Sequence, residues 1–168
     1  MSNLMSALKT IFARPKSYRE KLLEKTTKNT TYFSIHGNFL CKCVSVYDGD
    51  TINVVFDPFG SNGRIYRFRT RLLGIDTPEI KTKNPKEKEK AIIVRDYLRD
   101  LILDKLISVK CEGFDKYGRL LAYVYIKPYN ISTTLSQNDK MLNSVNQMLI
   151  NKNYAYAYDG GKKKDVVY

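Results

Sequence analysis

A strict period-two alternation at residues 65–73, IYRFRTRLL, most constrains how this chain can fold. In an extended backbone, successive side chains point to opposite faces, so apolar and basic residues separate here. The apolar face holds Tyr66, Phe68, Thr70 and Leu72. The opposite face holds Arg67, Arg69 and Arg71. The pattern predicts a β-strand with one buried and one open face.

Four further segments have the β-branched and aromatic composition of strands. They are residues 39–47, 51–56, 107–114 and 120–126. Helical spacing predicts a helix over residues 87–105 and a last helix from residue 141. The buried stripe expected for the first of these helices is Ile92, Ile93, Leu98, Leu101, Ile102 and Leu106. The order β-β-β-α-β-β-α predicts an α+β, mainly β fold, a five-stranded OB-type barrel with packed helices.

The N-terminal region differs from the expected barrel in composition. Residues 2–12 place apolar side chains on one helical stripe, and Pro15 ends that amphipathic helix. Two interpretations stay open for it, packing on its own domain or docking to a partner or an anionic membrane surface. We expect a basic helical extension and linker at residues 1–30, the barrel domain at 31–158 and a basic tail at 159–168.

Charge and residue counts exclude several functional classes. The chain of 168 residues has 29 Lys and Arg against 17 Asp and Glu, a net charge of +12 that favours nucleic acid as partner. The one histidine excludes two-histidine catalysis, HExxH zinc sites and Cys2His2 zinc fingers. Three cysteines cannot all pair within one chain, so reduced thiols are expected. With no convincing secretory signal, we expect an intracellular protein.

Acidic side chains gather where the basic excess disappears. Residues 31–80 carry five basic and five acidic side chains. Their turns and strand ends hold Asp48, Asp50, Asp76 and Glu79. An all-oxygen set of this kind suits Ca²⁺ or Mg²⁺. Arg71 lies at the end of the predicted third strand, just before residues 74–79, and Arg119 follows the predicted turn at residues 115–118. Guanidinium groups bind phosphate, so acids for a metal ion together with two arginines for a phosphate indicate phosphodiester cleavage.

Three motifs carry a resemblance to a known family. They are VYDGDT at 46–51, RLLGIDTPE at 71–79 and DKYGRLLAYVY at 115–125. In this order, with a helix between the last two, they resemble the staphylococcal nuclease (thermonuclease) family over about residues 39–158. The segment MLNSVNQMLINKNYAYAY is similar to the part of that family that follows the barrel.

The resemblance implies a role for each matching residue. Asp50 and Asp76 would ligate Ca²⁺ together with the backbone carbonyl of Thr77, and Asp48 would support the site. Glu79 would act as general base or orient the attacking water. The remaining roles fall on phosphate and base contacts. The clamps on the reacting phosphate would be Arg71 and Arg119, the terminal-phosphate contacts Lys116 and Tyr117, and the base-pocket tyrosines Tyr156 and Tyr158.

The resemblance thus implies a Ca²⁺-dependent, sugar-nonspecific nuclease. It would hydrolyse single-stranded or melted DNA and RNA and leave 3′-phosphate products. The first alternative is a non-catalytic nucleic-acid-binding module on the same fold. The second is a membrane-surface or scaffold protein that uses the helix at residues 2–12, a role that is compatible with either of the others. We expect a monomer.

Overall fold

The computed structural model describes residues 15–24, 28, 30–60, 63–126 and 143–161. It divides the chain into two units, Met1–Phe33 and Ser34–Tyr168. The first contains one described helix, α2 (Tyr18–Glu24). Ser17 begins α2 with a reciprocal cap, because its Oγ accepts from the backbone N of Glu20 at 3.3 Å and its own N donates to the Glu20 carboxylate at 2.8 Å. The amphipathic helix expected at residues 2–12 lies outside the described residues.

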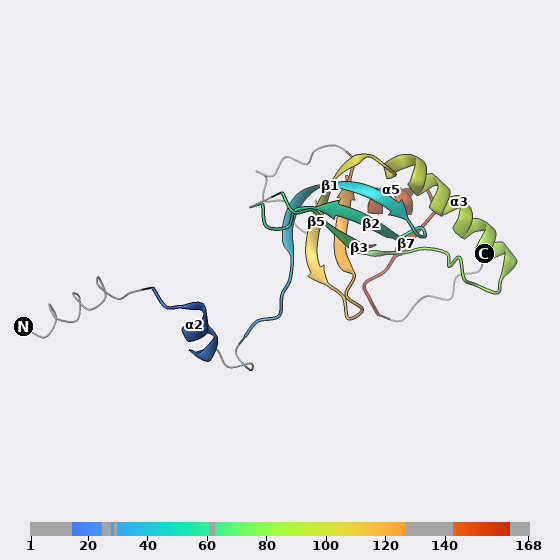
Figure 1. Cartoon of the computed structure of the whole chain (residues 1–168). Coiled ribbons are helices and arrows are strands. Elements are labelled where there is room, and N and C mark those ends of the chain that lie inside the picture. Colours follow the sequence, from blue (N-terminus) through green and yellow to red (C-terminus); the bar gives the residue numbers. More distant parts are fainter. Residues whose placement is uncertain (1–14, 25–27, 29, 61–62, 127–142, 162–168) are drawn as a thin grey trace, which may run out of the picture. The chain divides into compact units, whose positions relative to one another are not determined.

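The second unit is built on a closed barrel of five strands in the order β1-β2-β3-β6-β5 (Figure 1). Neighbouring strands are antiparallel except β3 and β6, whose parallel pairing closes the barrel. The strands are β1 (His36–Val46), β2 (Thr51–Phe56), β3 (Tyr66–Leu72), β5 (Leu106–Phe114) and β6 (Leu120–Tyr125). This arrangement confirms the predicted mainly β, OB-type barrel.

The alternation along β3 appears in the structure as predicted. Thr70 and Leu72 are buried, and Arg67 and Arg69 are exposed. Tyr66, at the first position of the strand, is exposed as well, because the barrel interior no longer covers it there. The open face of β3 is therefore basic along the length of the strand.

The long helix α3 (Pro85–Ile102) begins at Asn84, whose side-chain oxygen accepts from the backbone N of Lys86 at 3.0 Å. Its predicted stripe is wrong at three positions. Ile92 and Ile93 are 37% and 49% exposed, and Leu106 belongs to β5, where it is exposed. The buried residues are Ala91, Val94, Leu98 and Ile102. Their spacing of three and four residues is that of one helix face, and the two isoleucines fall beside it.

The last described helix, α5 (Val145–Asn151), packs against β6 and is fixed by a buried amide. The side-chain oxygen of Asn146 accepts from the backbone N of Val124 at 3.1 Å, and its nitrogen donates to the carbonyl of Leu73 at 2.8 Å. This amide joins α5 to β6 and to the turn after β3. The chain then enters β7 (Tyr156–Ala157), which pairs antiparallel with β4 (Ile75–Asp76).

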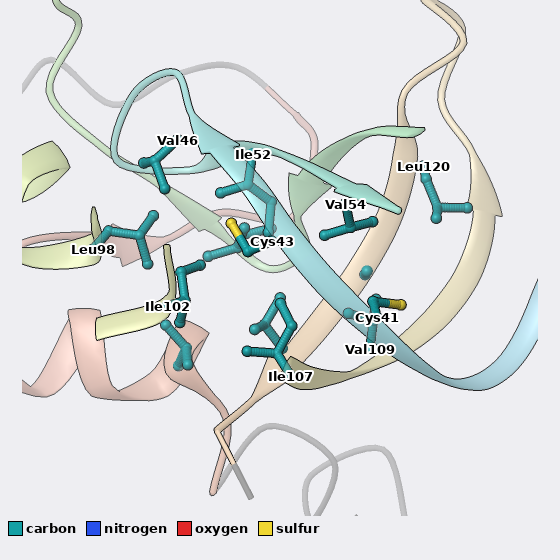
Figure 2. Close-up of a cluster of buried hydrophobic side chains, with 14 of the residues drawn as sticks. Cys41, Cys43, Val46, Ile52, Val54, Leu98, Ile102, Ile107, Val109 and Leu120 are labelled. Atoms are coloured by element: carbon teal, nitrogen blue, oxygen red, sulfur yellow. The ribbon is translucent and has the colours of Figure 1, made fainter. Parts of the chain in front are cut away.

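The three cysteines lie in the barrel region as free, buried thiols. Two of them, Cys41 and Cys43, are among the core side chains in Figure 2. Burial is the main reason that the pKa of Cys43 is raised to about 11 and that of Cys111 to about 12. These thiols therefore act as apolar core groups. Among the described residues, no helix combines the length and hydrophobicity needed to cross a membrane.

Candidate active site

The β1–β2 turn places the first two predicted acidic residues. The backbone N of Asp50 donates to Asp48 Oδ1 at 3.1 Å, which closes the turn. Gly49 lies between them in a space that admits no side chain. A Cβ there would meet Val94 Cγ1 at 2.7 Å and Thr77 Oγ1 at 2.8 Å. Close packing therefore presses this turn against α3 and against the segment after β4.

Asp50 is 2% exposed, and hydroxyl groups surround its carboxylate. Thr51 Oγ1 donates to Oδ1 at 3.0 Å, and Thr77 Oγ1 donates to Oδ2 at 3.1 Å. The pKa of Asp50 is raised to about 7, mainly because burial outweighs the opposing effect of Arg71, and the carboxylates of Asp48 and Asp76 contribute to the increase. The site thus holds a carboxylate in surroundings that favour an added cation.

Arg71 ends β3 and lies between the two predicted metal ligands. Its guanidinium forms an ion pair with Asp50, and its Nη2 donates to Asp76 Oδ1 at 2.7 Å and to the carbonyl of Ile75 at 3.1 Å. Burial lowers the pKa of Arg71, but the carboxylates around it have the greater effect and raise the pKa above its ordinary value. The tight turn through Gly74, with φ of +80°, returns β4 to this position.

Asp76 receives its second partner from the C-terminal segment. The strand pairing of β4 with β7 sets Asp76 opposite Tyr156, and the Tyr156 hydroxyl donates to Asp76 Oδ2. Tyr156 is the tyrosine for which the resemblance implies base stacking. In this structure it also ties the last strand to a carboxylate that is 1% exposed. The contact joins residues 80 positions apart in the chain, which sequence spacing could not indicate.

The β5–β6 loop carries the second arginine on a rigid turn. Asp115 Oδ1 accepts from the backbone N of Tyr117 at 2.9 Å and of Arg119 at 2.8 Å. Asp115 Oδ2 accepts from Arg119 Nε at 2.7 Å. Partial burial raises the pKa of Asp115, but these bonds together with the Arg119 charge lower it overall. Sequence reasoning missed Asp115 as a positioning residue, although an Asp four residues before an Arg with Gly118 between them was a readable signal.

A cleft with a volume of about 800 Å³ gathers the phosphate-binding candidates. The predicted site residues that line it are Arg71, Lys116, Tyr117, Arg119 and Tyr158. The hydroxyl of Tyr158 donates to the carbonyl of Gly161 at 2.7 Å, and its backbone N donates to the carbonyl of Gly74 at 3.0 Å. The lining combines three basic side chains with two carboxylates, Asp115 and Asp159, and with tyrosines and apolar residues. This composition suits a phosphate next to a nucleobase.

The other predicted residues are divided between two places. Asp50, Asp76 and Thr77 are buried behind Arg71 and do not line the cleft. Glu79 follows them in the loop before α3; it is exposed and also lies outside the cleft lining. The backbone N of Glu79 donates to Glu87 Oε1 at 3.1 Å, so α3 holds this loop by a side chain of its first turn. Arg71 alone belongs to both the carboxylate cluster and the cleft.

The donor set fits a hard divalent cation. Two nearly inaccessible carboxyl groups, those of Asp50 and Asp76, both pair with the guanidinium of Arg71 and offer oxygen ligands side by side. In the described part of the chain, no three His, Cys, Asp or Glu side chains come together as a metal site. An ion here would therefore need backbone carbonyl and water oxygens besides the two carboxylates, as Ca²⁺ and Mg²⁺ accept. His36, exposed at the start of β1, takes no part.

Fold and site together define an OB-barrel protein with a cleft lined by arginines, lysine and tyrosines beside a buried carboxylate cluster. Residues 69–166 match the family described as staphylococcal nuclease homologue. The chain belongs to this nuclease family.

Two relatives agree with the assignment. The uncharacterised protein MJ1439 of Methanocaldococcus jannaschii is 30% identical over 133 residues, which cover 67% of this chain and 60% of that protein. Endonuclease YncB of Bacillus subtilis is 34% identical over 91 residues, which cover 52% of this chain and 40% of that protein. The chain thus spans less than two thirds of the length of either relative.

Proposed function

We propose that this chain is a calcium-dependent nuclease that hydrolyses phosphodiester bonds of single-stranded or melted DNA and RNA without regard to the sugar. The observation that carries the proposal is the position of Arg71, which pairs with two buried carboxylates and also lines a basic cleft. This position supports the proposal, because a cation held by the carboxylates would then lie next to a phosphate held in the cleft. The endonuclease named among the relatives supports the same reaction class.

The two arginines would bind the reacting phosphate from the cleft. The hydrogen bond from Arg119 Nε to Asp115 holds the side chain in one orientation. The other two guanidinium nitrogens are therefore already oriented before a phosphate binds. Arg71 would exchange carboxylate oxygens for phosphate oxygens when substrate is bound. Both guanidinium groups would then stabilise the negative charge that builds up on the five-coordinate phosphorus.

Asp50 and Asp76 would hold the cation, completed by the carbonyl of Thr77 and supported by Asp48. Bound Ca²⁺ would supply electrostatic stabilisation of a phosphate oxygen. Glu79 would accept the proton of the attacking water or orient it, a contribution of about 10²- to 10⁴-fold in rate. The water oxygen bonds to phosphorus while the bond to the 5′-oxygen breaks, which leaves a 3′-phosphate and a 5′-hydroxyl.

The remaining predicted residues would bind the substrate. Lys116 and Tyr117 would contact a terminal phosphate, and both lie on the cleft wall. Tyr156 and Tyr158 would pack against a base. The hydroxyl of Tyr156 already bonds to Asp76, so base binding and the carboxylate cluster would be coupled through this side chain.

One observation favours a second function, a nucleic-acid-binding module without catalysis. Glu79 lies outside the cleft lining, and Arg71 is occupied by its two carboxylates. In such a module, the basic cleft would bind a strand while the carboxylates serve to hold Arg71.

Degradation of heat-denatured DNA and of RNA by the purified full chain distinguishes the two functions. The reactions contain Ca²⁺, Mg²⁺ or EDTA. The test variants are Glu79→Gln and Arg119→Gln. Their matched controls are Glu89→Gln and Arg99→Gln, which remove the same charges from exposed positions on α3.

The nuclease function predicts cleavage with Ca²⁺ and a fall of at least about 10²-fold for each test variant. The controls should cut as the wild type does. Salt-sensitive binding of DNA with no cleavage in any metal would refute it in favour of the binding module. Cleavage in Mg²⁺ equal to that in Ca²⁺ would refute the calcium dependence alone.

A further inference from the structure

A second cationic group borders the cleft, centred on Tyr47. This tyrosine directly precedes Asp48 and is 45% exposed. The guanidinium carbon of Arg69 lies 5.1 Å from the centre of its ring, and Lys81 Nζ lies 5.9 Å from it. We call these three residues the Tyr47 cluster. Each is one or two positions from a predicted site residue in the chain, and Arg69 also lines a hollow that shares residues with the cleft.

The cluster is continuous with the cleft through a smaller hollow. This hollow, with a volume of about 370 Å³, is lined by Arg69, Tyr117, Gly118 and Arg119. Tyr117 and Arg119 also line the large cleft. A ligand that fills the cleft and extends past Arg119 would therefore meet Arg69 next.

The charge of Arg69 is available to such a ligand. Within the residues that the structure describes, no carboxylate pairs with Arg69 or Arg67, whereas Arg71 and Arg119 both have acidic partners. Residues on one face of a strand recur about every 7 Å. The row Arg71, Arg69, Arg67 along β3 thus has a repeat comparable to that of the phosphates in an extended single strand.

We propose that single-stranded nucleic acid bound in the cleft continues over Arg119 onto the Tyr47 cluster, so that Arg69 and Lys81 bind phosphates beyond the one in the cleft. The inference rests on the substrate class of the proposed function, not on turnover.

The ring of Tyr47 explains why these two long side chains can bind effectively. Free lysine and arginine side chains lose much rotamer freedom when they bind. A cation held over an aromatic ring is partly ordered beforehand, so it loses less on contact with a phosphate. The stacked guanidinium also offers a planar surface to a base, and such stacking tolerates any sequence.

Fluorescence anisotropy in EDTA tests the path without any cleavage. The probes are labelled single strands of two and twelve nucleotides. The wild type is compared with Arg69→Gln/Lys81→Gln and with Tyr47→Leu. The matched control is Lys88→Gln/Arg99→Gln, which removes the same charge from α3, none of whose residues lines either hollow.

We expect the Arg69→Gln/Lys81→Gln variant to bind the twelve-nucleotide strand about 10-fold more weakly near 0.1 M salt, because two phosphate contacts are lost. The slope of log affinity against log salt should fall by about 1.4, the value for two phosphates of a single strand. Affinity for the dinucleotide should stay close to wild type. Tyr47→Leu should weaken binding of the longer strand only. The salt slope of the control should differ from that of the wild type by less than about half the value for one phosphate contact.

Equal losses for the two lengths would overturn the inference, as would an equal loss in the control. A larger effect of the variant on vesicles of anionic lipid than on the twelve-nucleotide strand would overturn it too and assign the surface to membranes. If the wild type cuts no nucleic acid, but Arg69→Gln/Lys81→Gln weakens binding of the twelve-nucleotide strand only, the proposed nuclease is refuted and the path stands. If the wild type is a Ca²⁺-dependent nuclease, but the two substitutions do not weaken the longer strand selectively, the path is refuted and the proposed nuclease stands.

Discussion

The two turns that carry the site are built from the same residue types but differ in their surroundings. The β1–β2 turn buries Asp50 among hydroxyl groups beneath α3, and burial raises the pKa of its carboxyl to about 7. The β5–β6 loop leaves Asp115 half-buried, and its hydrogen bonds lower the pKa of that carboxyl despite partial burial.

The difference shows how one residue type serves two purposes. At Asp50, burial disfavours the charged carboxylate, so its ionised form depends on a nearby cation, which Arg71 supplies. At Asp115, the charge is already balanced by Arg119 and by backbone N–H groups, so it determines only where the arginine points. Burial thus outweighs the opposing effects at Asp50, whereas hydrogen bonds and the Arg119 charge outweigh partial burial at Asp115.

The largest expected effect separates the two arginines. Arg71→Gln leaves Asp50 and Asp76 buried without their cation, and we expect the free energy of unfolding to fall by about 3 kcal/mol. Arg119→Gln removes a partly solvated pair and should cost less than about 1 kcal/mol. Urea denaturation of the metal-free proteins measures both. Adding Asp50→Asn to Arg71→Gln should recover part of the loss, and equal costs for the two arginine variants would contradict the comparison.

A smaller effect separates the two glycines. An alanine at Gly49 would place its Cβ within 3 Å of Val94 and Thr77, and such overpacking should cost about 2 kcal/mol. An alanine at Gly118 meets nothing within 4 Å and suffers only the strain of φ at +76°, about 1 kcal/mol. Urea denaturation compares them. A Gly118→Ala variant that is less stable than Gly49→Ala would show that the first turn can move away from α3.

Much of the barrel follows from the sequence because strand periodicity is a local property. The strand at residues 51–56 has the predicted bounds, and β3 shows the predicted arginine face. The β1–β2 and β5–β6 turns were readable for the same reason, since aspartate and glycine act on their own neighbours. Hence the motifs lie where they were expected.

Long-range contacts could not be derived in this way. Ile92 and Ile93 are apolar, yet they fall beside the buried face that Ala91 and Val94 share, and only the barrel surface selects that face. The buried amide of Asn146 and the bond from Tyr156 to Asp76 each join segments more than 20 residues apart. From sequence alone, such polar residues are predicted to be exposed to solvent. Their hydrogen-bond partners are distant in the chain and come close only in the folded protein.

The smallest expected effect concerns the pH dependence of the β5–β6 loop. The pKa of Asp115 is lower in the folded protein than its unfolded value of about 3.9, so its charge stabilises the fold above that value. This stabilisation should be lost as the pH falls through the folded pKa. The difference in free energy of unfolding between wild type and Asp115→Asn should therefore be constant from about pH 7 to 5 and shrink below about pH 4, with a total under about 1 kcal/mol.

Urea titrations across this range measure the difference, and the Arg119→Gln background gives the matched comparison. There the backbone bonds from Tyr117 and residue 119 remain while the guanidinium is gone, so the pH-dependent part should decrease without vanishing. A difference that widens as the pH falls would mean that burial, not hydrogen bonding, controls Asp115. The two turns would then differ in degree only, and Asp115 would have to be regarded, like Asp50, as a carboxylate in need of a cation.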